Sequence, residues 1–316
     1  MKEFVITQKD QGRRLDKFIM NLLKSAPPSF TYKMLRKKNI VLNDRKASGS
    51  ELLACNDTVK LYLSDETFEK FAARPDRWAG EDMIRLMPQI IYEDDDIMIV
   101  NKPSGMLTQR SSSSDISLNE ICISYVRKKD PAGRQAEDFT PSVCNRLDRN
   151  TSGLVTFAKT YRGARCLSDA FAGRRMGKYY MCIAIGLIKD EMALTGTLTK
   201  DEATNKVSVK SMGDGAKILT IVRPVRHNDR LTLAEVELLT GKTHQIRAHL
   251  AAYGHPLLGD DKYGDRAVNR QYRQRYGIRS QMLVCTRLVF PDDLGLPDLA
   301  GRTVSINLPE EFDKVM

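Results

Sequence analysis

Helical and extended spacings of apolar residues follow each other along this chain without a regular rhythm, and this pattern limits the fold more than any single motif. Strand candidates lie at residues 97–100, 154–158, 178–185 and 231–239, and helix candidates at 118–128, 162–171 and 244–253. A doubly wound sheet would need strands and helices in strict alternation. The order along the chain therefore favours an α+β fold with a mixed sheet.

A short N-terminal stretch carries most of the chain's charge. The 316 residues include 50 Lys and Arg against 40 Asp and Glu, a formal net charge of +10. Residues 12–64 contain eleven of these cations and four of the acids, a surplus of seven. Charge concentrated in one segment favours an anionic partner such as the phosphates of RNA over a general solubility effect.

The basic segment also has its own folding pattern. Apolar residues of one helical face run from Leu15 to Leu22, and the Pro27–Pro28 pair ends that helix. Ser29 is expected to cap a second short helix, and strands are expected at 39–43 and 59–63. The domains expected from these patterns are a small basic α/β domain at 1–68, a linker at 69–89 and a larger domain at 90–316.

No feature of the sequence predicts a membrane or a secreted protein. The apolar stretch from Met181 to Ile188 is far shorter than the roughly 20 residues that span a bilayer. The first 14 residues contain no apolar run of signal-peptide length. The six cysteines, which form no Cys-x-x-Cys pair, stand at positions 55, 122, 144, 166, 182 and 285. Scattered thiols are typical of a reduced cytoplasmic protein, so we expect that location.

Familiar cofactor motifs are incomplete. Gly241–Thr243 resembles the end of a phosphate loop, but Val236 stands where its first glycine should be. His244, His249 and His255 are spaced by five and six residues and do not share one helical face. We therefore expect no metal and no cofactor. The residues that an alternative, metal-dependent hydrolase would use are His244, His249 and Asp260 or Asp261.

One candidate for chemistry is the polar segment 145–155. It places Asp148 between Arg146 and Arg149, just before a predicted strand. Nearby positive charge keeps a carboxylate ionised, and an ionised aspartate can act as a nucleophile. A turn stabilised by Asp and Asn side chains explains the same composition.

Two further segments contain residues suited to binding a substrate. In residues 240–250, Thr243 is expected to cap a helix whose first turn holds Arg247, a mildly unfavourable place for a cation that suggests a carboxylate partner. An arginine paired only with solvent is the alternative. In residues 177–181, Tyr179 and Tyr180 point to opposite faces of a strand, so one ring can face a base or a sugar.

Together these segments resemble the RluA-type family of pseudouridine synthases. The matching stretches are NRLDRNTSGLVTFAKT at 145–160, KYYMCIAIG at 178–186, LLTGKTHQIRAHLAAYGHPLLGDDKYG at 238–264 and EDDDIMIVNKPSGML at 93–107. Residues 12–64 are similar to the RNA-binding domain named after ribosomal small-subunit protein four. The chain departs from the family pattern at Asn145, where members often have His, and at Lys242, where many have Arg.

The resemblance implies an α+β fold with a largely antiparallel central sheet and flanking helices and loops. It implies that Asp148 is the nucleophile, that Arg247 pairs with it and that Tyr180 packs on the uracil. Further substrate contacts are implied for Arg146, Lys178, Thr243, His244 and Gln245. Contacts from the basic domain to RNA are implied for Arg13, Arg14, Lys33, Arg36, Lys37 and Lys38.

The same resemblance implies a reaction and a substrate. The enzyme would isomerise uridines in structured RNA, most directly large-subunit ribosomal RNA, after flipping the base into a pocket and without a cofactor. Loops at 108–117 and 266–279 would help to select the site, and we expect a monomer. Transfer RNA as the substrate and a catalytically silent RNA-binding protein are the alternatives.

Overall fold

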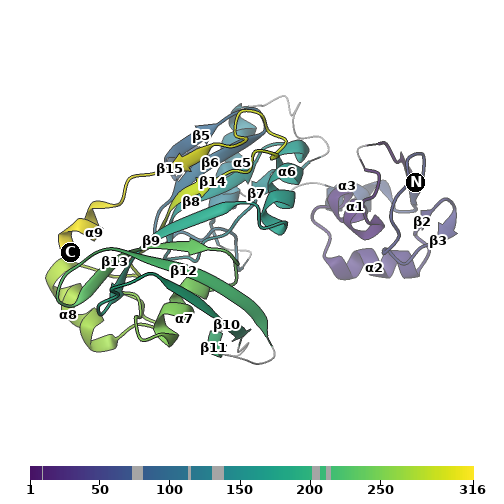
Figure 1. Ribbon diagram of the computed structural model, residues 1–316. Coiled ribbons are helices and arrows are strands. Elements are labelled where there is room, and N and C mark those ends of the chain that lie inside the picture. Colours follow the sequence, from purple (N-terminus) through teal and green to yellow (C-terminus); the bar gives the residue numbers. More distant parts are fainter. Residues whose placement is uncertain (9, 73–80, 113–114, 130–138, 201–206, 211–214) are drawn as a thin grey trace. The chain divides into compact units, whose positions relative to one another are not determined.

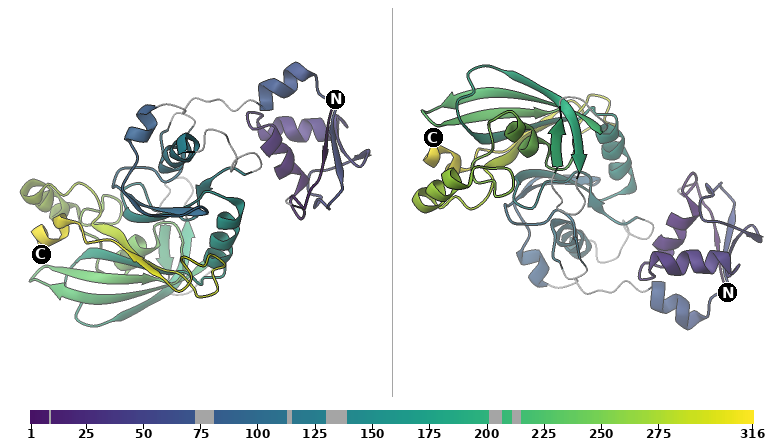
Figure 2. Two further views of the ribbon diagram at one scale, coloured as in Figure 1. Left: turned by 90° about the horizontal axis from the view of Figure 1, so that it is seen from above. Right: turned by 90° about the horizontal axis from the view of Figure 1, so that it is seen from below.

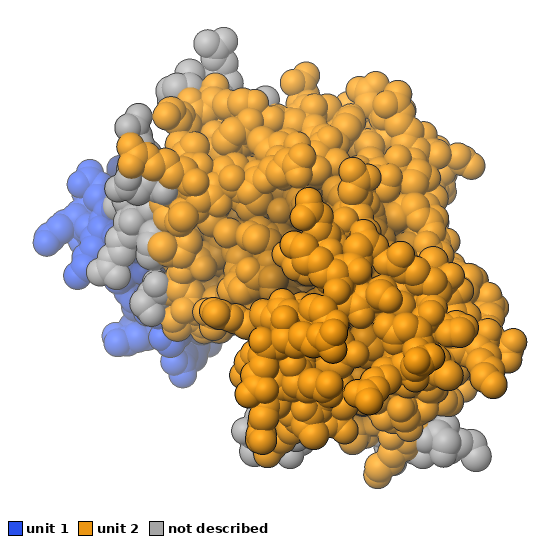
Figure 3. Space-filling view, turned by 90° about the vertical axis from the view of Figure 1, so that its left-hand side faces the viewer, with its two compact units in different colours: residues 1–79 blue, residues 80–316 orange. Residues whose placement is uncertain are grey.

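The chain forms two compact units. The computed structural model describes residues 1–8, 10–72, 81–112, 115–129, 139–200, 207–210 and 215–316. Its contacts divide the chain into Met1–Ala79 and Gly80–Met316, coloured separately in Figure 3. This division falls inside the range 69–89, where the sequence predicts a linker. Among the described helices, none has the length and apolar character needed to cross a bilayer.

The small unit is a sheet covered by helices. Its elements are β1 (Lys2–Val5), α1 (Leu15–Leu22), α2 (Pro28–Arg36), β2 (Ile40–Leu42), β3 (Arg45–Lys46), β4 (Thr58–Leu61) and α3 (Asp65–Ala72). In its described part, four antiparallel strands pair in the order β1-β4-β2-β3. The expected α1 is present, and it buries Leu15, Phe18 and Ile19 in the core of this unit.

One turn and one helix start in the small unit follow from local chemistry. Asn43 and Asp44 join β2 to β3 with φ of 49° and 60°, the conformation that a two-residue hairpin turn requires. Helix α2 begins at Pro28, whose missing N–H needs no partner at the first helical position. Ser29 therefore lies inside the helix, and the expectation that it caps α2 is wrong.

The large unit contains the rest of the chain. Its elements are α4 (Glu81–Arg85), β5 (Ile90–Glu93), β6 (Ile97–Lys102), α5 (Leu118–Lys129), β7 (Ser142–Val143), β8 (Ser152–Ala158), α6 (Tyr161–Ala172), β9 (Gly177–Ile185), β10 (Met192–Lys200), β11 (Val207–Lys210), β12 (Ala216–His227), β13 (Leu231–Leu238), α7 (Gln245–Ala252), α8 (Arg266–Tyr276), β14 (Leu283–Val289), β15 (Thr303–Ser305) and α9 (Glu310–Val315).

Among the described residues of this unit, eleven strands form one sheet. Its main order is β11-β10-β12-β13-β9-β14-β8-β6-β5, with β7 beside β8 and β15 beside β14. The pairs are antiparallel except that β8 and β14 run parallel. Figures 1 and 2 show β10–β13 as one half of the sheet and β5, β6 and β8 as the other, with α6 packed against β8 and α7 against β11 and β12. The expected α+β fold with a mixed, largely antiparallel sheet is confirmed.

The register of three neighbouring strands brings distant segments to one level of the sheet. Cys285 in β14 lies opposite Tyr180 in β9 on one side and opposite Gly153 in β8 on the other. Gly153 has a φ of +111°, and a Cβ atom there would lie 2.2 Å from the carbonyl oxygen of Cys285. Only glycine permits this approach, so Gly153 fixes where the loop before β8 leaves the sheet.

We predict that Gly153→Ala destabilises the protein by more than about 3 kcal/mol, because the new methyl group meets the backbone of β14 and the left-handed φ adds strain. Gly254→Ala is the matched control, since Gly254 also has a positive φ, +84°, but has no atom within 4 Å of its Cβ position. Its cost should stay near 1 kcal/mol. Urea unfolding followed by circular dichroism measures both, and equal losses would contradict the role of the close approach.

Candidate active site

A pocket of about 800 Å³ opens where the loop before β8 faces the turn between β13 and α7. Its size suits a small organic group such as a nucleotide. The pocket lining includes all eight residues that the family resemblance assigns to catalysis or substrate contact: Arg146, Asp148, Lys178, Tyr180, Thr243, His244, Gln245 and Arg247. These eight residues come from three separate stretches of sequence, which therefore meet in one place.

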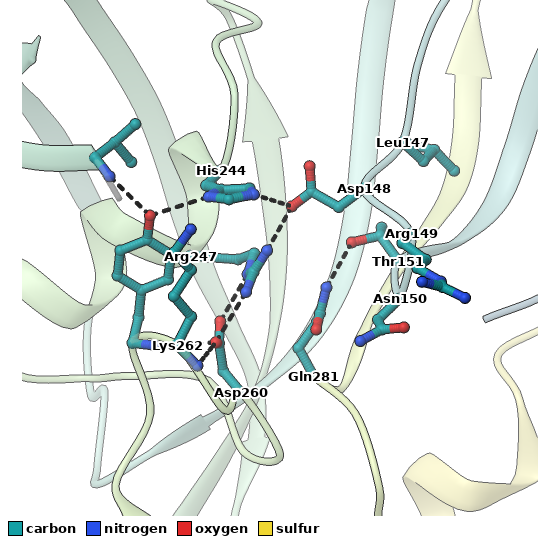
Figure 4. Close-up of polar contacts among 12 residues, drawn as sticks. Leu147, Asp148, Arg149, Asn150, Thr151, His244, Arg247, Asp260, Lys262 and Gln281 are labelled. Carbon is teal, nitrogen blue, oxygen red and sulfur yellow. Dashed lines mark hydrogen bonds and ion pairs between the residues drawn. The ribbon is translucent and has the colours of Figure 1, made fainter. Parts of the chain in front are cut away.

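Asp148 and Arg247 form an ion pair inside this pocket, although 99 residues separate them in the sequence. Nη1 of Arg247 donates to Oδ2 of Asp148 at 2.8 Å. Figure 4 marks this contact with a dashed line. The carboxylate partner expected for Arg247 is therefore present. Among the described contacts, neither adjacent arginine bonds to Asp148: Arg149 donates from Nε to the carbonyl of Gly105, and Arg146 is exposed.

A second carboxylate, for which the sequence suggested only a metal-ligand role, holds the other edge of the same guanidinium. Nε and Nη2 of Arg247 donate to the two carboxylate oxygens of Asp260 at 2.7 and 3.0 Å. Asp260 is fully buried, and its Oδ1 also accepts the backbone N–H groups of Lys262 and Tyr263. A bidentate contact of this kind fixes the plane of the guanidinium, so Nη1 is aimed at Asp148.

The charges of this cluster support one another. Burial opposes a charge on Arg247, but its bonds to Asp260 and then Asp148 outweigh burial and raise the pKa of Arg247. Burial would likewise raise the pKa of Asp260, but the hydrogen bonds from Arg247 outweigh it and lower that pKa. One guanidinium is thus shared between two carboxylates. Asp148 is oriented without having a cation to itself.

The backbone of the Asp148 loop is held from both sides. Thr108 Oγ1 donates to the carbonyl of Leu147 at 2.7 Å and accepts the N–H of the same residue at 3.2 Å. Gln281 Nε2 donates to Oγ1 of Thr151 at 3.2 Å. These contacts flank Asp148 and limit the motion of its Cα.

A buried lysine adds a third support, and the sequence had suggested no role for it. Lys102 is fully buried, and its Nζ donates to the carbonyls of Pro103, Met106 and Arg149 at 2.8–3.0 Å. Burial lowers the pKa of Lys102 to about 8, opposed by the charge of Asp148. Its bond to Arg149 ties the residue after Asp148 to the turn that follows β6.

The turn before α7 differs from the sequence prediction. His244, in the left-handed conformation with φ of 53°, occupies the N-cap position, so the expectation that Thr243 caps this helix is wrong. The amide of Gln245 accepts from Thr240 and Lys242 and donates to Leu219 and Thr220. All its hydrogen-bonding positions are satisfied within the protein. We therefore assign Gln245 to shaping the turn rather than to substrate contact.

Tyr180 and Lys178 lie on the β9 wall of the pocket. Burial, with a smaller effect of Cys285, raises the pKa of Tyr180 far above its ordinary value, so its hydroxyl stays protonated. Burial also lowers the pKa of Lys178. Within the described part of the chain, Lys178 Nζ has no hydrogen-bond or ion-pair partner. A half-buried ammonium without a protein partner is suited to an anionic or carbonyl group of a ligand.

The pocket rim is cationic. Arg146, Arg149, Arg174 and Lys242 are exposed there, while Asp148 is the acid in the lining. A rim of this kind attracts a polyanion and leaves the carboxylate for the reacting group.

At position 145, where the chain departs from the family pattern, the amide oxygen of Asn145 accepts the backbone N–H and the hydroxyl of Thr156. Asn145 thus ties the loop to β8.

The six residues expected to contact RNA from the basic domain lie in the small unit, and two of them are engaged in ion pairs. Arg13 pairs with Asp10 at 2.9 Å, and Arg14 makes two bonds to the buried Asp16. The other four of the six, Lys33, Arg36, Lys37 and Lys38, are exposed and have no ion-pair partner among the described residues. The exposed end of α2 is therefore one basic surface of this unit.

The alternative metal site has no geometric support. Both oxygens of Asp260 are bonded to Arg247, and Nδ1 of the buried His249 lies 3.0 Å from the hydroxyl of Thr220. Across the ranges that the structure describes, no three His, Cys, Asp or Glu side chains converge as metal ligands do.

We predict that Asp260→Asn lowers the free energy of unfolding at pH 7 by about 3 kcal/mol, because a buried charge pair loses one partner. The lowered pKa of Asp260 means that its stabilisation is present above the unfolded value near 4 and is lost as the pH falls through the folded value. The gap between the two proteins should therefore shrink on acidification, as urea unfolding at several pH values measures. Asp261→Asn, at an exposed carboxylate, should show little change; a pH-independent gap would contradict the assignment.

Comparison with known proteins points to one family. Residues 96–252 match the family model described as RNA pseudouridylate synthase. The chain is 30% identical over 310 residues to "Ribosomal large subunit pseudouridine synthase C" of Vibrio vulnificus, covering 96% of this chain and 92% of that protein. It is 31% identical to the protein of the same name from Vibrio cholerae, covering 91% and 88%.

Solved structures show the same fold. Human RNA Pseudouridylate Synthase Domain Containing 4 superimposes with a TM-score of 0.55 at 20% identity, covering 73% of this chain and 92% of that one. Human RNA Pseudouridylate Synthase Domain Containing 1 gives 0.51 at 22% identity, covering 72% and 92%. The identity to the curated relatives extends over nearly their whole length, and the chain therefore belongs to the RluA-type family of RNA pseudouridine synthases.

Proposed function

We propose that this enzyme converts uridine to pseudouridine in structured RNA with Asp148 as the nucleophile, acting on a base flipped into the pocket. One observation carries the proposal: Oδ2 of Asp148 is held by Arg247, while Oδ1 makes no hydrogen bond or ion pair with the described residues. Figure 4 shows this second oxygen pointing away from Arg247 and His244. A carboxylate with one oxygen fixed and one free is arranged for nucleophilic attack.

The reaction fits the groups available. The bond between uracil N1 and ribose C1′ breaks, a bond between C5 and C1′ forms, and the proton lost at C5 is balanced by one gained at N1. Because this is an isomerisation, no external electron donor or acceptor is required. The protein must hold the detached ring and stabilise charge while the ring turns.

Residues of the pocket wall can share these tasks. Tyr180 offers an aromatic face to the uracil and a protonated hydroxyl close to the reacting ring. Lys178 offers an unpaired ammonium to a phosphate or a carbonyl oxygen. Arg146, exposed at the rim, can enter the space that the flipped base leaves in the RNA.

Affinity for RNA comes from exposed cations outside the pocket. The described end of α2 presents Lys33, Arg36, Lys37 and Lys38, in the module that resembles the ribosomal-protein-four domain. In the large unit, α8 contains no acid and presents Arg266, Arg270 and Arg275 to solvent. Such surfaces bind the phosphate backbone, while the pocket selects the base.

Large-subunit ribosomal RNA is the substrate that we propose. The names of the relatives from two Vibrio species support this choice, as does a basic module suited to a large folded RNA. We further propose that the enzyme acts as a monomer in the cytoplasm, in keeping with its free cysteines. Transfer RNA remains the alternative, and it is distinguished by comparing both RNA pools in the same assay.

We predict that Asp148→Asn abolishes pseudouridine formation, lowering the single-turnover rate by at least about 10⁴-fold, because the amide cannot act as the nucleophile. RNA binding should persist, since the cationic surfaces are unchanged. Tritium release from RNA labelled at uridine C5 measures turnover, and filter binding measures affinity.

Asp261→Asn is the matched control for this substitution, because its exposed carboxylate pairs with Arg273 on the surface, and it should retain the full rate. Near-normal turnover by Asp148→Asn would show that another group is the nucleophile. An absence of tritium release by the unmodified enzyme from ribosomal and transfer RNA alike would favour the silent RNA-binding protein.

We predict that the double substitution Arg266→Gln, Arg270→Gln weakens RNA binding and flattens its salt dependence. Each lost phosphate contact lowers the slope of log affinity against log salt by roughly 0.7–0.9, so the pair should lower it by about 1.5. The single-turnover rate at saturating RNA should not change. Arg226→Gln is the control, because Arg226 is committed to Asp313; equal slopes for both proteins would rule out α8 as an RNA-binding surface.

A further inference from the structure

A second side chain faces the oxygen of Asp148 that Arg247 holds. Nε2 of His244 lies 3.9 Å from Oδ2 of Asp148, and the ring is half-buried at the start of α7 (Figure 4). The separation is longer than a hydrogen bond. Catalytic hydrogen bonds are often this long before substrate closes the site.

The other nitrogen of the same ring is fixed by a tyrosine that the sequence analysis did not single out. Nδ1 of His244 lies 3.0 Å from the hydroxyl of Tyr263. That hydroxyl also accepts the backbone N–H of Val207, at the start of β11, at 3.0 Å. Burial raises the pKa of Tyr263, so the phenol keeps its proton.

This chain of contacts favours one tautomer of His244. A backbone N–H can only donate, so the Tyr263 oxygen accepts from Val207. Among the described residues, Nδ1 of His244 is the neighbour left for the single phenolic proton, and it accepts that proton when it is itself unprotonated. In this arrangement the neutral ring carries its proton on Nε2, the atom that faces Asp148.

The surrounding charges keep the ring neutral. Burial lowers the pKa of His244; Asp148 and Asp260 favour the protonated ring, whereas Arg247 and Lys262 oppose it. The lowering effects are the larger, so the imidazole is uncharged near pH 7. A full second cation beside Asp148 would reduce the nucleophilicity of the carboxylate, whereas a neutral N–H donor can orient it at less cost.

We propose that His244 is a positioning residue for the nucleophile: in the Nε2–H form set by Tyr263 and Val207, it restrains Oδ2 of Asp148 together with Arg247 and leaves Oδ1 to attack. The word nucleophile here rests on the function proposed above. His244 thereby gains a role distinct from the substrate contact that the family resemblance implies, and Tyr263 and β11 become part of the site.

The first test uses the left-handed backbone of His244 to separate positioning from stability. His244→Asn keeps an amide near Nδ1 for Tyr263 and suits a positive φ better than His, but it cannot reach Asp148. His244→Gln extends an N–H to the place of Nε2 but does not suit the backbone. A residue needed only to start α7 would make Asn the better replacement in every assay.

We predict opposite rankings in two measurements. The melting temperature of His244→Asn should equal or exceed that of the unmodified enzyme, while its single-turnover rate should fall about 10- to 100-fold with RNA affinity unchanged. His244→Gln should melt no higher than the unmodified enzyme and yet react faster than His244→Asn. His255→Asn, at a ring bonded to the carbonyl of Ile185 outside the pocket, is the control and should keep the full rate. A normal rate for His244→Asn would overturn the proposal.

The second test reads the tautomer directly and does not depend on activity. The chain has four histidines, so nitrogen NMR of protein labelled at histidine is tractable, and the signal missing from His244→Asn identifies the ring. We predict a neutral His244 at pH 7 with its proton on Nε2, and a shift toward the other tautomer in Tyr263→Phe. Tyr253→Phe, at an exposed ring, should leave the signal unchanged. A proton on Nδ1 would refute the inference even in an active enzyme, whereas an inactive enzyme with the expected tautomer would refute only the proposed function.

Discussion

The geometry of the site depends on one guanidinium shared by two carboxylates. Asp260, fully buried, holds two nitrogens of Arg247 and thereby fixes the plane in which the third nitrogen meets Asp148. An arginine paired with Asp148 alone could rotate with the mobile end of its partner. The second carboxylate, Asp260, is itself held by backbone N–H groups. The orientation of Asp148 is therefore fixed through Arg247 and Asp260 by the folded backbone, and not by another flexible side chain alone.

The pocket also depends on the strand register, which places residues of β8, β14 and β9 side by side in the sheet. The parallel pairing of β8 and β14 places Gly153 against Cys285, and Cys285 lies opposite Tyr180 on β9. The loop that carries Asp148 is held by Lys102, whose buried ammonium donates hydrogen bonds to backbone carbonyls. The strands therefore determine where the pocket lies, and buried polar contacts determine the conformation of the loop that contains Asp148.

Features that depend on local residue patterns or on ordered motifs could be predicted from the sequence. Strands such as β13 could be predicted from alternation, and the ion pair of Asp148 with Arg247 followed from a family resemblance. The role of Asp260 could not be predicted, because it arises only where the loop after α7 folds back on that helix. Thr243 was wrongly expected as a cap because the left-handed His244 and the side chain of Gln245 already satisfy that turn. Local propensity gave no sign of either.

The distribution of charge separates two tasks that would otherwise conflict. Phosphate binding calls for many cations, yet a carboxylate surrounded by free cations would be neutralised and a poor nucleophile. Here the exposed cations stand at the rim and on α2 and α8, whereas Arg247 divides its charge between Asp148 and Asp260. A neutral imidazole beside Asp148, rather than a further lysine or arginine, follows the same logic: it adds direction to the carboxylate without adding charge.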